Sequence, residues 1–252
     1  MPRFFVDLPL SPGAKIELPP VPAHHASRVL RLVKGSEVVL FNGRGGEYPA
    51  VLEWVDKDGV RARCLEWRDI ERESPLDIRL AQGISSGERM DYTLQKAVEM
   101  GVREIQPLAM RRSVVKLNKE RAEKRVAHWQ GVVMSACEQS GRNYLPTVAL
   151  PLDIPQWLAT QDMSRADSAS MPQGLKLFLS PEAELTLSAL PPPAGTVWMV
   201  AGPEGGFEPE EAKLIVDFGF VPVRLGPRIL RTETAALAAV AAMQALWGDY
   251  GH

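Results

Sequence analysis

The sequence predicts an α/β protein in which a β-rich N-terminal module precedes a largely parallel sheet with helices on its faces. Before residue 72, short strand-like runs are separated by the turn dipeptides Asn42-Gly43 and Asp58-Gly59. After it, strand-like and helix-like runs alternate. A charged segment ending in Ser74-Pro75 separates the two patterns, so we expect domains at 1–72 and 73–252.

The N-terminal module is predicted to be a small β-barrel interrupted by one helix, from about residue 23 to 32. The helix carries His24, Arg28 and Arg31, whose spacing of four and three places them on one face. No acidic or cysteine partner stands near His24-His25 at metal-ligand spacing, so we expect no metal site there. The expected strands are 3–6, 15–18, 37–41, 47–55 and 60–67.

The C-terminal part is predicted to alternate strands and helices. A helix beginning near Met90 is preceded by a capping-box spacing from Ser85 to Glu88 and ends at Gly101. The polar segment 161–173 is expected to be a mobile loop. The other helices are expected at 119–140, from Glu208 onward and at 233–247, and the strands at 77–84, 104–110, 147–150, 175–179, 196–200 and 220–225.

The last predicted helix, 233–247, is apolar on every side. A helix without a polar face is buried on nearly all sides, so it should pack either in the core or against a second subunit. Its many alanines would let neighbouring backbones come close.

The amino-acid composition limits which classes of protein this chain can belong to. The chain has 252 residues, 45% of them hydrophobic, which is enough for one large or two moderate domains. No window reaches the eighteen uninterrupted apolar residues of a membrane span, and we expect a cytoplasmic protein. The two cysteines, Cys64 and Cys137, imply neither a disulfide framework nor a thiolate metal site.

Charge is distributed unevenly although the net charge is only −2. Residues 111–125 contain seven Lys or Arg against two Glu, whereas residues 143–252 contain six Lys or Arg against twelve Asp or Glu. A local basic patch on a mildly acidic protein favours a polyanion bound at one place, and a solvated helix start is the alternative interpretation.

Two glycine-containing turns near the C-terminus are the strongest candidates for a ligand site. The first follows the buried strand 196–200 and reads Gly202-Pro203-Glu204-Gly205-Gly206; the second lies within Leu225-Gly226-Pro227. In an open α/β sheet such loops lie at the carboxyl ends of strands, where ligands bind. Neither turn matches the dinucleotide fingerprint or the Walker loop.

These two turns and several other segments resemble one family. Gly202 to Phe207, with Leu225-Gly226-x-x-Ile229-Leu230-Arg231-x-Glu233-Thr234-Ala235, is similar to the two cofactor motifs of SPOUT-class RNA methyltransferases, specifically the small-subunit ribosomal RNA uridine-N3 methyltransferases. The likeness extends over nearly the whole chain. Further matching segments are Arg3-Phe4-Phe5, His24-His25 with Val29-Leu30-Arg31, Phe41-Asn42-Gly43 with Gly46-Glu47-Tyr48, Gln95 to Val102, and Glu138 to Arg142.

The resemblance implies a PUA-like RNA-binding β-barrel followed by a methyltransferase domain whose C-terminus is threaded as a trefoil knot, a rare exception to unthreaded topology. It implies S-adenosyl-L-methionine as cofactor, a homodimer with the site at its interface, and small-subunit ribosomal RNA or the assembled small ribosomal subunit as partner, without DNA or membrane. The expected cofactor-binding residues are Leu179, Ala201, Gly202, Pro203, Glu204, Gly205, Gly206, Leu225, Gly226, Ile229, Leu230 and Thr234; the expected RNA-binding residues are Arg3, His24, Arg28, Arg31, Arg111, Arg112 and Lys116.

Methylation of uridine N3 requires removal of its proton. Glu138, Glu204 and Glu233 are unranked candidates for the base, and Arg142 or Arg231 could stabilise negative charge on the uracil oxygens. Glu233 can also be read as a helix-start carboxylate favoured by the helix dipole. The alternative functions are a ribose 2′-O RNA methyltransferase on the same fold and a non-catalytic RNA-binding ribosome-assembly factor.

Overall fold

The computed structural model describes residues 1–166 and 174–251, which form two compact units. One unit contains Met1–Glu73 together with Met134–Leu145, and the other contains Ser74–Val133 and Pro146–His252. The division after Glu73 lies one residue beyond the boundary expected from the sequence. The sequence did not indicate that residues 134–145 would group with the N-terminal unit. No helix of the described residues is long and apolar enough to cross a membrane.

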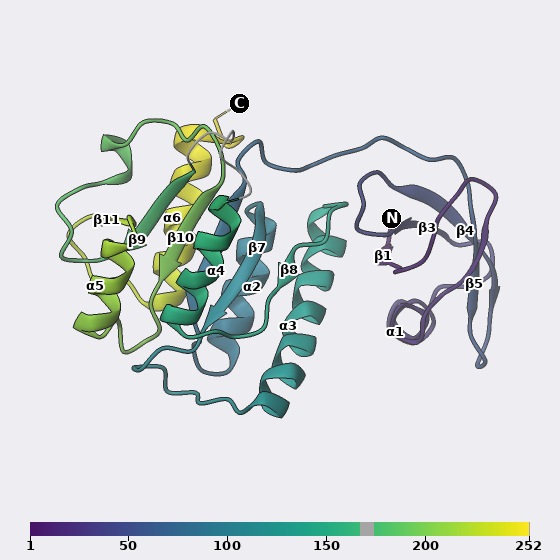
Figure 1. Ribbon diagram of the computed structural model, residues 1–252. Coiled ribbons are helices and arrows are strands. Elements are labelled where there is room, and N and C mark those ends of the chain that lie inside the picture. The colour runs from purple at the N-terminus through teal and green to yellow at the C-terminus, as the bar shows by residue number, and fades with distance from the viewer. Residues whose placement is uncertain (167–173, 252) are drawn as a thin grey trace. The chain divides into compact units, whose positions relative to one another are not determined.

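The first unit is built on a mixed five-stranded sheet with the order β1-β3-β4-β5-β2 (Figure 1). Strand β1 pairs with β3 in parallel, and the other pairs are antiparallel. Strands β1 and β2 are the two ends of this order and do not pair with each other, so the sheet is open where the sequence predicted a small β-barrel. The strands are β1 (Arg3–Phe5), β2 (Lys15–Glu17), β3 (Glu37–Phe41), β4 (Tyr48–Val55) and β5 (Val60–Cys64).

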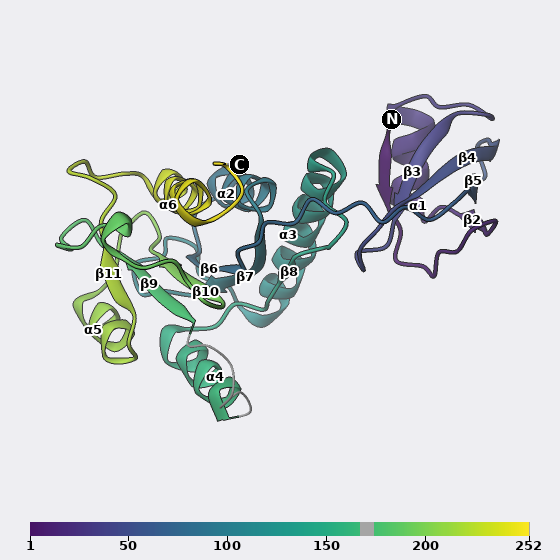
Figure 2. The ribbon, with the colours of Figure 1, turned by 90° about the horizontal axis from the view of Figure 1, so that it is seen from above.

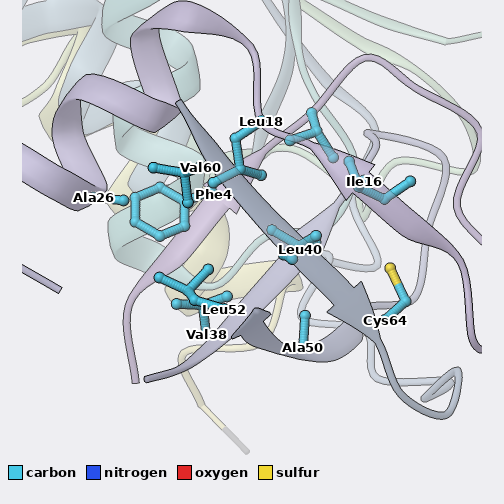
Figure 3. Close-up of a cluster of buried hydrophobic side chains, with 12 residues drawn as sticks. Phe4, Ile16, Leu18, Ala26, Val38, Leu40, Ala50, Leu52, Val60 and Cys64 are labelled. Atoms are coloured by element: carbon cyan, nitrogen blue, oxygen red, sulfur yellow. The ribbon is translucent and has the colours of Figure 1, made fainter. Parts of the chain in front are cut away.

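Alternating apolar residues of these strands form the core of the first unit. Phe4, Leu40 and Leu52 are fully buried in one cluster, which Ala26 closes from the helical segment (Figure 3). Because side chains alternate between the faces of a strand, every second residue of β3 and β4 reaches this cluster. The predicted strands in this region are therefore present, most of them shortened by one to three residues.

The predicted helix 23–32 is wrong in its bounds. Helix α1 (Pro20–His24) starts earlier, with Pro20 at its first position, and continues into one π-helical turn, His25–Val29. Arg31 lies beyond this segment and has a left-handed backbone, with φ of +51°. The expected common face of His24, Arg28 and Arg31 assumed a regular α-helix, which this segment does not form.

Two polar clusters hold residues 134–145 within the first unit. Arg3 is ion-paired with Glu47 and donates a 2.6 Å hydrogen bond to Asn143 Oδ1. Arg142 is 3% exposed and makes two parallel hydrogen bonds to Glu73, of 2.8 and 2.6 Å. Such a bidentate arrangement compensates the loss of hydration that both charges suffer on burial.

The second unit is a six-stranded parallel sheet with the order β11-β9-β10-β6-β7-β8. Helices α2 and α6 lie on one face of the sheet, and α4 and α5 lie on the other (Figure 2). The strands are β6 (Ile78–Gly83), β7 (Val102–Leu108), β8 (Thr147–Val148), β9 (Leu175–Leu179), β10 (Val197–Ala201) and β11 (Val221–Val223). The helices are α2 (Glu88–Glu99), α3 (Lys119–Ser140), α4 (Ile154–Ala166), α5 (Pro209–Asp217) and α6 (Thr232–Trp247), and the residues of α3 from Met134 onward belong to the first unit.

Helix α4 was not predicted, and its last residues, 161–166, fall in the segment expected to be a loop. Tertiary packing explains the helix, because Trp157 is fully buried and its ring centroid lies 5.5 Å from those of Trp198 and Phe220. Residues 167–173 of that predicted loop lie outside the described residues. The capping box from Ser85 to Glu88 is also wrong, since Gly87 is the N-cap and makes no side-chain capping bond.

Helix α6 brings the chain back from the edge strand β11 to the middle of the sheet. It packs against α2, and its first residue, Thr232, is hydrogen-bonded to the ends of both β6 and β10. This return places the C-terminal helix among the loops of earlier strands, as a trefoil-knotted fold requires. At its other end, Gln244 is buried and donates a 2.7 Å hydrogen bond to the Met100 carbonyl.

We predict that Arg142→Met lowers the free energy of unfolding by about 3–5 kcal/mol, because it leaves the buried Glu73 carboxylate without its bidentate partner. Urea titration would measure the change. The double variant Glu73→Gln/Arg142→Met should recover part of the loss. The control is Arg68→Met, which breaks an exposed pair with Glu66 and should cost no more than about 1 kcal/mol. Equal losses in Arg142→Met and Arg68→Met would contradict this prediction.

Candidate active site

A cavity of about 690 Å³ opens at the carboxyl edge of the second unit's sheet. Most of its wall comes from three loops, which follow β9, β10 and β11, and from the first residues of α6. Arg89 of α2, Arg112 from the loop after β7, and the start of α5 complete it. All three strands are parallel, so their carboxyl ends meet at this edge, which is where ligands bind in open α/β sheets. The two glycine turns singled out in the sequence both lie here.

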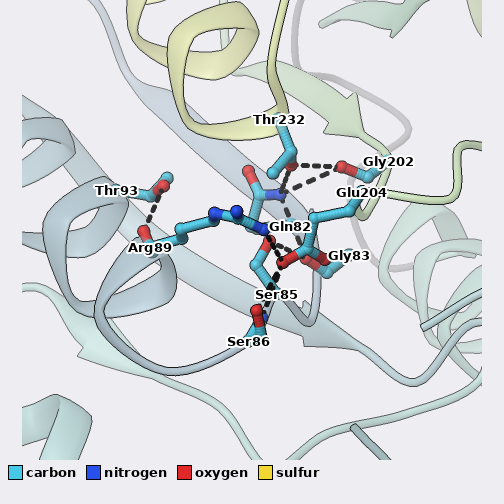
Figure 4. A network of polar contacts seen from close by, with 9 residues as sticks. All are labelled: Gln82, Gly83, Ser85, Ser86, Arg89, Thr93, Gly202, Glu204 and Thr232. Atoms are coloured by element: carbon cyan, nitrogen blue, oxygen red, sulfur yellow. Dashed lines mark hydrogen bonds and ion pairs between the residues drawn. The ribbon is translucent and has the colours of Figure 1, made fainter. Parts of the chain in front are cut away.

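A buried hydrogen-bond network joins the loop after β10 to β6 and α6 (Figure 4). The Gly202 carbonyl accepts hydrogen bonds from the Thr232 hydroxyl and from Gln82 Nε2, which also donates to Thr232 Oγ1 at 3.1 Å. Gln82 is fully buried. Because these groups have little access to water, each depends on the others for its hydrogen bonds, and the network fixes the loop rigidly.

Close packing explains two of the loop glycines. A Cβ atom at Gly202 would lie 2.7 Å from the ring of Phe207, and one at Gly205 would lie 2.8 Å from the Arg112 carbonyl oxygen. Gly206 differs from both. Its φ is +70°, no described atom lies within 4 Å of its Cβ position, and it lines the cavity. The expectation that missing side chains give a ligand access therefore fits Gly206, whereas Gly202 and Gly205 are needed for packing within the protein.

Two family models match the chain: an RNA methyltransferase domain over residues 72–244 and an RNA methyltransferase PUA domain over residues 23–64. The chain is 31% identical to the ribosomal RNA small subunit methyltransferase E of Bacillus subtilis over 96% of both chains. The chain belongs to this family of ribosomal RNA small subunit methyltransferases.

Solved structures of family members have the same fold. The Neisseria gonorrhoeae ribosomal RNA small subunit methyltransferase E bound to S-adenosylmethionine is 43% identical, with a TM-score of 0.88 and 99% of each chain covered. A Legionella pneumophila putative methyltransferase with bound S-adenosylmethionine is 40% identical, with a TM-score of 0.90 and 98% of each chain covered. The fold class predicted from the sequence, a SPOUT-type α/β-knot methyltransferase domain after a PUA-like domain, is confirmed.

Most residues predicted to bind the cofactor line the cavity of this methyltransferase. Gly205 and Thr234 are absent from its wall, and Thr234 is exposed. The ten that line it are Leu179, Ala201, Gly202, Pro203, Glu204, Gly206, Leu225, Gly226, Ile229 and Leu230. Other wall residues were not predicted from the sequence, among them Phe178, Ser180 and Pro181. No motif marks these three; their only signal was their place at the end of a predicted strand.

Glu204 is held by the start of α2. Its Oε1 atom accepts hydrogen bonds from the Ser86 amide and hydroxyl, both at 2.9 Å, and from Arg89 at 3.1 Å (Figure 4). Burial is the largest single influence and would raise the pKa of Glu204, but the hydrogen bonds together outweigh it, so its pKa lies below the ordinary value. A carboxylate with a lowered pKa and three donors is a weak proton acceptor, which favours a positioning role over that of the base.

Arg231 and Glu233 also line the cavity, where they flank Thr232. Glu233 lies in the first turn of α6, as its interpretation as a helix-start carboxylate expected. Its Oε2 atom is buried and has no hydrogen-bond partner among the described residues. A buried acceptor without a donor is uncommon in a native protein and is found at functional sites, so Glu233 keeps both interpretations.

Glu138 and Arg142, the other two catalytic candidates, belong to the first unit. Glu138 Oε1 accepts a 3.0 Å hydrogen bond from the Phe5 amide, and burial raises the pKa of this carboxyl. The Arg142 guanidinium is bound to Glu73. The structure therefore gives both side chains partners inside the first unit, and their catalytic roles stay predictions.

The basic residues predicted to bind RNA are partly engaged elsewhere. Arg111 and Arg112 form ion pairs with Glu210 and Glu208 at the start of α5. Lys116 Nζ donates to two backbone carbonyls, at 2.9 and 3.1 Å. Arg3 has only 12% of its side chain exposed and pairs with Glu47. His24, Arg28 and Arg31 are exposed, and no ion pair engages them among the described residues.

We predict that Glu204→Gln lowers the free energy of unfolding by about 1–2 kcal/mol at pH 7, because the hydrogen bonds to Glu204 are assisted by its charge. Since the pKa of Glu204 is lowered by folding, this stabilisation is present above the ordinary value of 4.5 and is lost as the pH falls through the lower folded value. Urea titrations from pH 7 to below 4.5 should show the two proteins converging. If the difference in the free energy of unfolding between the two proteins did not depend on pH, the lowered pKa of Glu204 would be refuted.

Proposed function

We propose that this methyltransferase transfers the methyl group of S-adenosyl-L-methionine to N3 of a uridine in small-subunit ribosomal RNA. The match at 43% identity over the whole chain to a ribosomal RNA small subunit methyltransferase E bound to S-adenosylmethionine carries the proposal. The proposed substrate is the ribosomal RNA alone or in an assembled small ribosomal subunit.

The cavity has the chemistry that such a cofactor needs. Its wall combines an apolar side, from residues such as Phe178, Leu179 and Leu230, with backbone groups of the two glycine turns. An adenine ring fits between apolar side chains and backbone donors, and a volume of about 690 Å³ lies in the range of small-molecule sites. We infer that Gly202, Gly206, Leu225 and Leu230 hold the adenosine through their backbones.

When bound, S-adenosylmethionine supplies an activated methyl group, so the protein's task is positioning and electrostatics. We favour Glu233 for accepting the N3 proton, because it lines the cavity and no hydrogen bond or ion pair engages it among the described residues. Glu204 also has one buried oxygen without a partner, but its other oxygen accepts three hydrogen bonds. Arg231 also lines the cavity, and its cationic guanidinium would stabilise negative charge on a uracil oxygen.

We further propose that the enzyme is a homodimer. Helix α6 is apolar on all sides, yet Leu246 is 47% exposed, and Tyr250, which follows the helix, is exposed as well. Exposed apolar groups that lie together often mark protein–protein contacts.

The ribose 2′-O methyltransferase remains the alternative within the same fold, and the reaction product distinguishes the two. N3 of uracil is far more acidic than a ribose hydroxyl, so a carboxylate such as Glu233 and a cation such as Arg231 suffice for it. N3 lies on the Watson–Crick edge, so the target must be unpaired or flipped outward.

We therefore predict that small-subunit ribosomal RNA incubated with enzyme and cofactor contains N3-methyluridine. Complete nuclease digestion followed by mass spectrometry of the nucleosides measures this product. A mock reaction without cofactor is the control. Methyl groups on ribose, or on any base other than uracil, would contradict the proposed specificity.

A second prediction concerns Gly206. Gly206→Val should weaken S-adenosylmethionine binding by about tenfold or more, because a branched side chain would enter the open space beside the cavity wall. Isothermal titration calorimetry would measure the affinity. The matched control is Gly219→Val, since Gly219 also has a positive φ, of +90°, and an open Cβ position but lies outside the cavity wall. Equal affinities of the two variants would remove Gly206 from the site.

A further inference from the structure

The acidic C-terminal part of the chain concentrates its positive charge in one place. Residues 143–252 contain six Lys or Arg, and three of these, Arg224, Arg228 and Arg231, fall within the segment 224–231. All three line the cavity. Glu182, Glu204 and Glu233 also line this cavity, but no ion pair joins any of them to the three arginines among the described residues. Like charges so close together are unfavourable in the free protein, so their position in a cavity wall favours binding of an anionic ligand.

These three arginines differ from the other arginines of the cavity wall in their partners. Arg89 pairs with Glu204 and Arg112 pairs with Glu208. In contrast, no ion pair engages Arg224, Arg228 or Arg231 within residues 1–166 and 174–251, and all three are exposed. Their charges are therefore available to a ligand, whereas those of Arg89 and Arg112 are already neutralised.

The backbone of this segment is held in place. The Arg224 amide donates a 2.9 Å hydrogen bond to the Leu185 carbonyl, next to an isolated β-bridge with Thr186. Gly226 turns the chain with a φ of +81°, and the Arg228 guanidinium lies 3.9 Å from the position of its missing Cβ. Ile229 follows with 86% of its surface exposed. The segment thus presents cationic groups and an apolar side chain from an anchored turn.

The cofactor alone does not account for this arrangement. S-adenosylmethionine carries a cationic sulfonium and one carboxylate, so it cannot neutralise several guanidinium groups. A nucleic-acid strand has a phosphate at every nucleotide, and an exposed aliphatic side chain can contact a base.

We propose that the segment 224–231 is the docking edge for an unpaired RNA strand. Arg224 and Arg228 bind phosphates next to the target nucleotide, and Ile229 packs against an exposed base. This inference rests on the proposed RNA methyltransferase function. It assigns RNA contacts to Arg224 and Arg228, which the sequence did not single out, and to Ile229, which was expected to bind the cofactor.

The test measures binding of a fluorescein-labelled single-stranded oligouridylate of about 15 nucleotides by anisotropy, from about 0.1 to 1 M salt. The variant is Arg224→Gln/Arg228→Gln. The control is Lys124→Gln/Lys213→Gln, which removes two exposed, ion-paired charges from the same unit. A third protein, Arg224→Lys/Arg228→Lys, keeps the positive charges.

Loss of two phosphate contacts should reduce the magnitude of the slope of log affinity against log salt by about 1.4, so the affinity of the variant should fall roughly 25-fold less per decade of salt than that of the unmodified protein. The lysine control should keep the slope of the unmodified protein, and Arg224→Lys/Arg228→Lys should recover most of the lost slope. S-adenosylmethionine affinity of the variant should change by less than about twofold, since the proposed contacts are to RNA.

An unchanged slope in Arg224→Gln/Arg228→Gln would overturn the inference. So would a change in molecular mass by sedimentation without a change in slope, because the segment would then contact a second copy of the chain. If the unmodified protein bound neither the RNA nor S-adenosylmethionine, the proposed function itself would fail, which is a different result from failure of this inference.

Discussion

The Gly202 carbonyl is the point on which the catalytic half of the molecule depends. It accepts hydrogen bonds from Gln82 on β6 and from Thr232 at the start of α6, so one backbone oxygen links three segments far apart in sequence. Both donors come from within the protein: Gln82 lies in β6, and the return of the chain into α6 brings Thr232 to the same oxygen. The start of α6 is thereby fixed beside the loop that it helps to close into a cavity wall.

The loops of the cavity depend on this fixed point and on short side chains. Gly83 approaches Pro203 so closely that a Cβ would lie 2.5 Å from its nitrogen, and Gly205 approaches the Arg112 carbonyl in the same way. Glu204 adds a polar link to the first turn of α2. The loop after β10 is therefore packed on both sides, which leaves Gly206 as the glycine with open space and a positive φ. Close packing of this kind makes a rigid cofactor site out of irregular backbone.

Much of the fold could be predicted from sequence, since strands such as β3 and β10 are apolar runs between turn residues and α3 has a clear helical pattern. The errors have physical causes. Helix α4 is stabilised by burial of Trp157 between distant aromatic rings, which no local pattern reveals. The π-helical turn after α1 removed the face that an α-helix would have given to Arg28 and Arg31. Thr232 was not selected from the sequence although its buried hydroxyl donates to the Gly202 carbonyl, and the cofactor role expected for the exposed Thr234 stays a prediction.

The ion pairs show most clearly why the functional residues of the site could not be selected from the sequence alone. The sequence marked residues 111–125 as the basic patch, yet Arg111 and Arg112 are neutralised by carboxylates of α5 that lie about a hundred positions away. The same rule ranks the carboxylates. Glu204 and Glu233 each have one buried oxygen without a partner among the described residues, but the other oxygen of Glu204 is held by three donors and that of Glu233 by none. A side chain that already has a partner gains less from a ligand, because it must first give up that interaction. The structure shows which charged side chains already have a partner, and sequence spacing cannot show this for residues far apart in the chain. Side chains with a partner hold the cavity in shape, whereas those without one are available to a ligand.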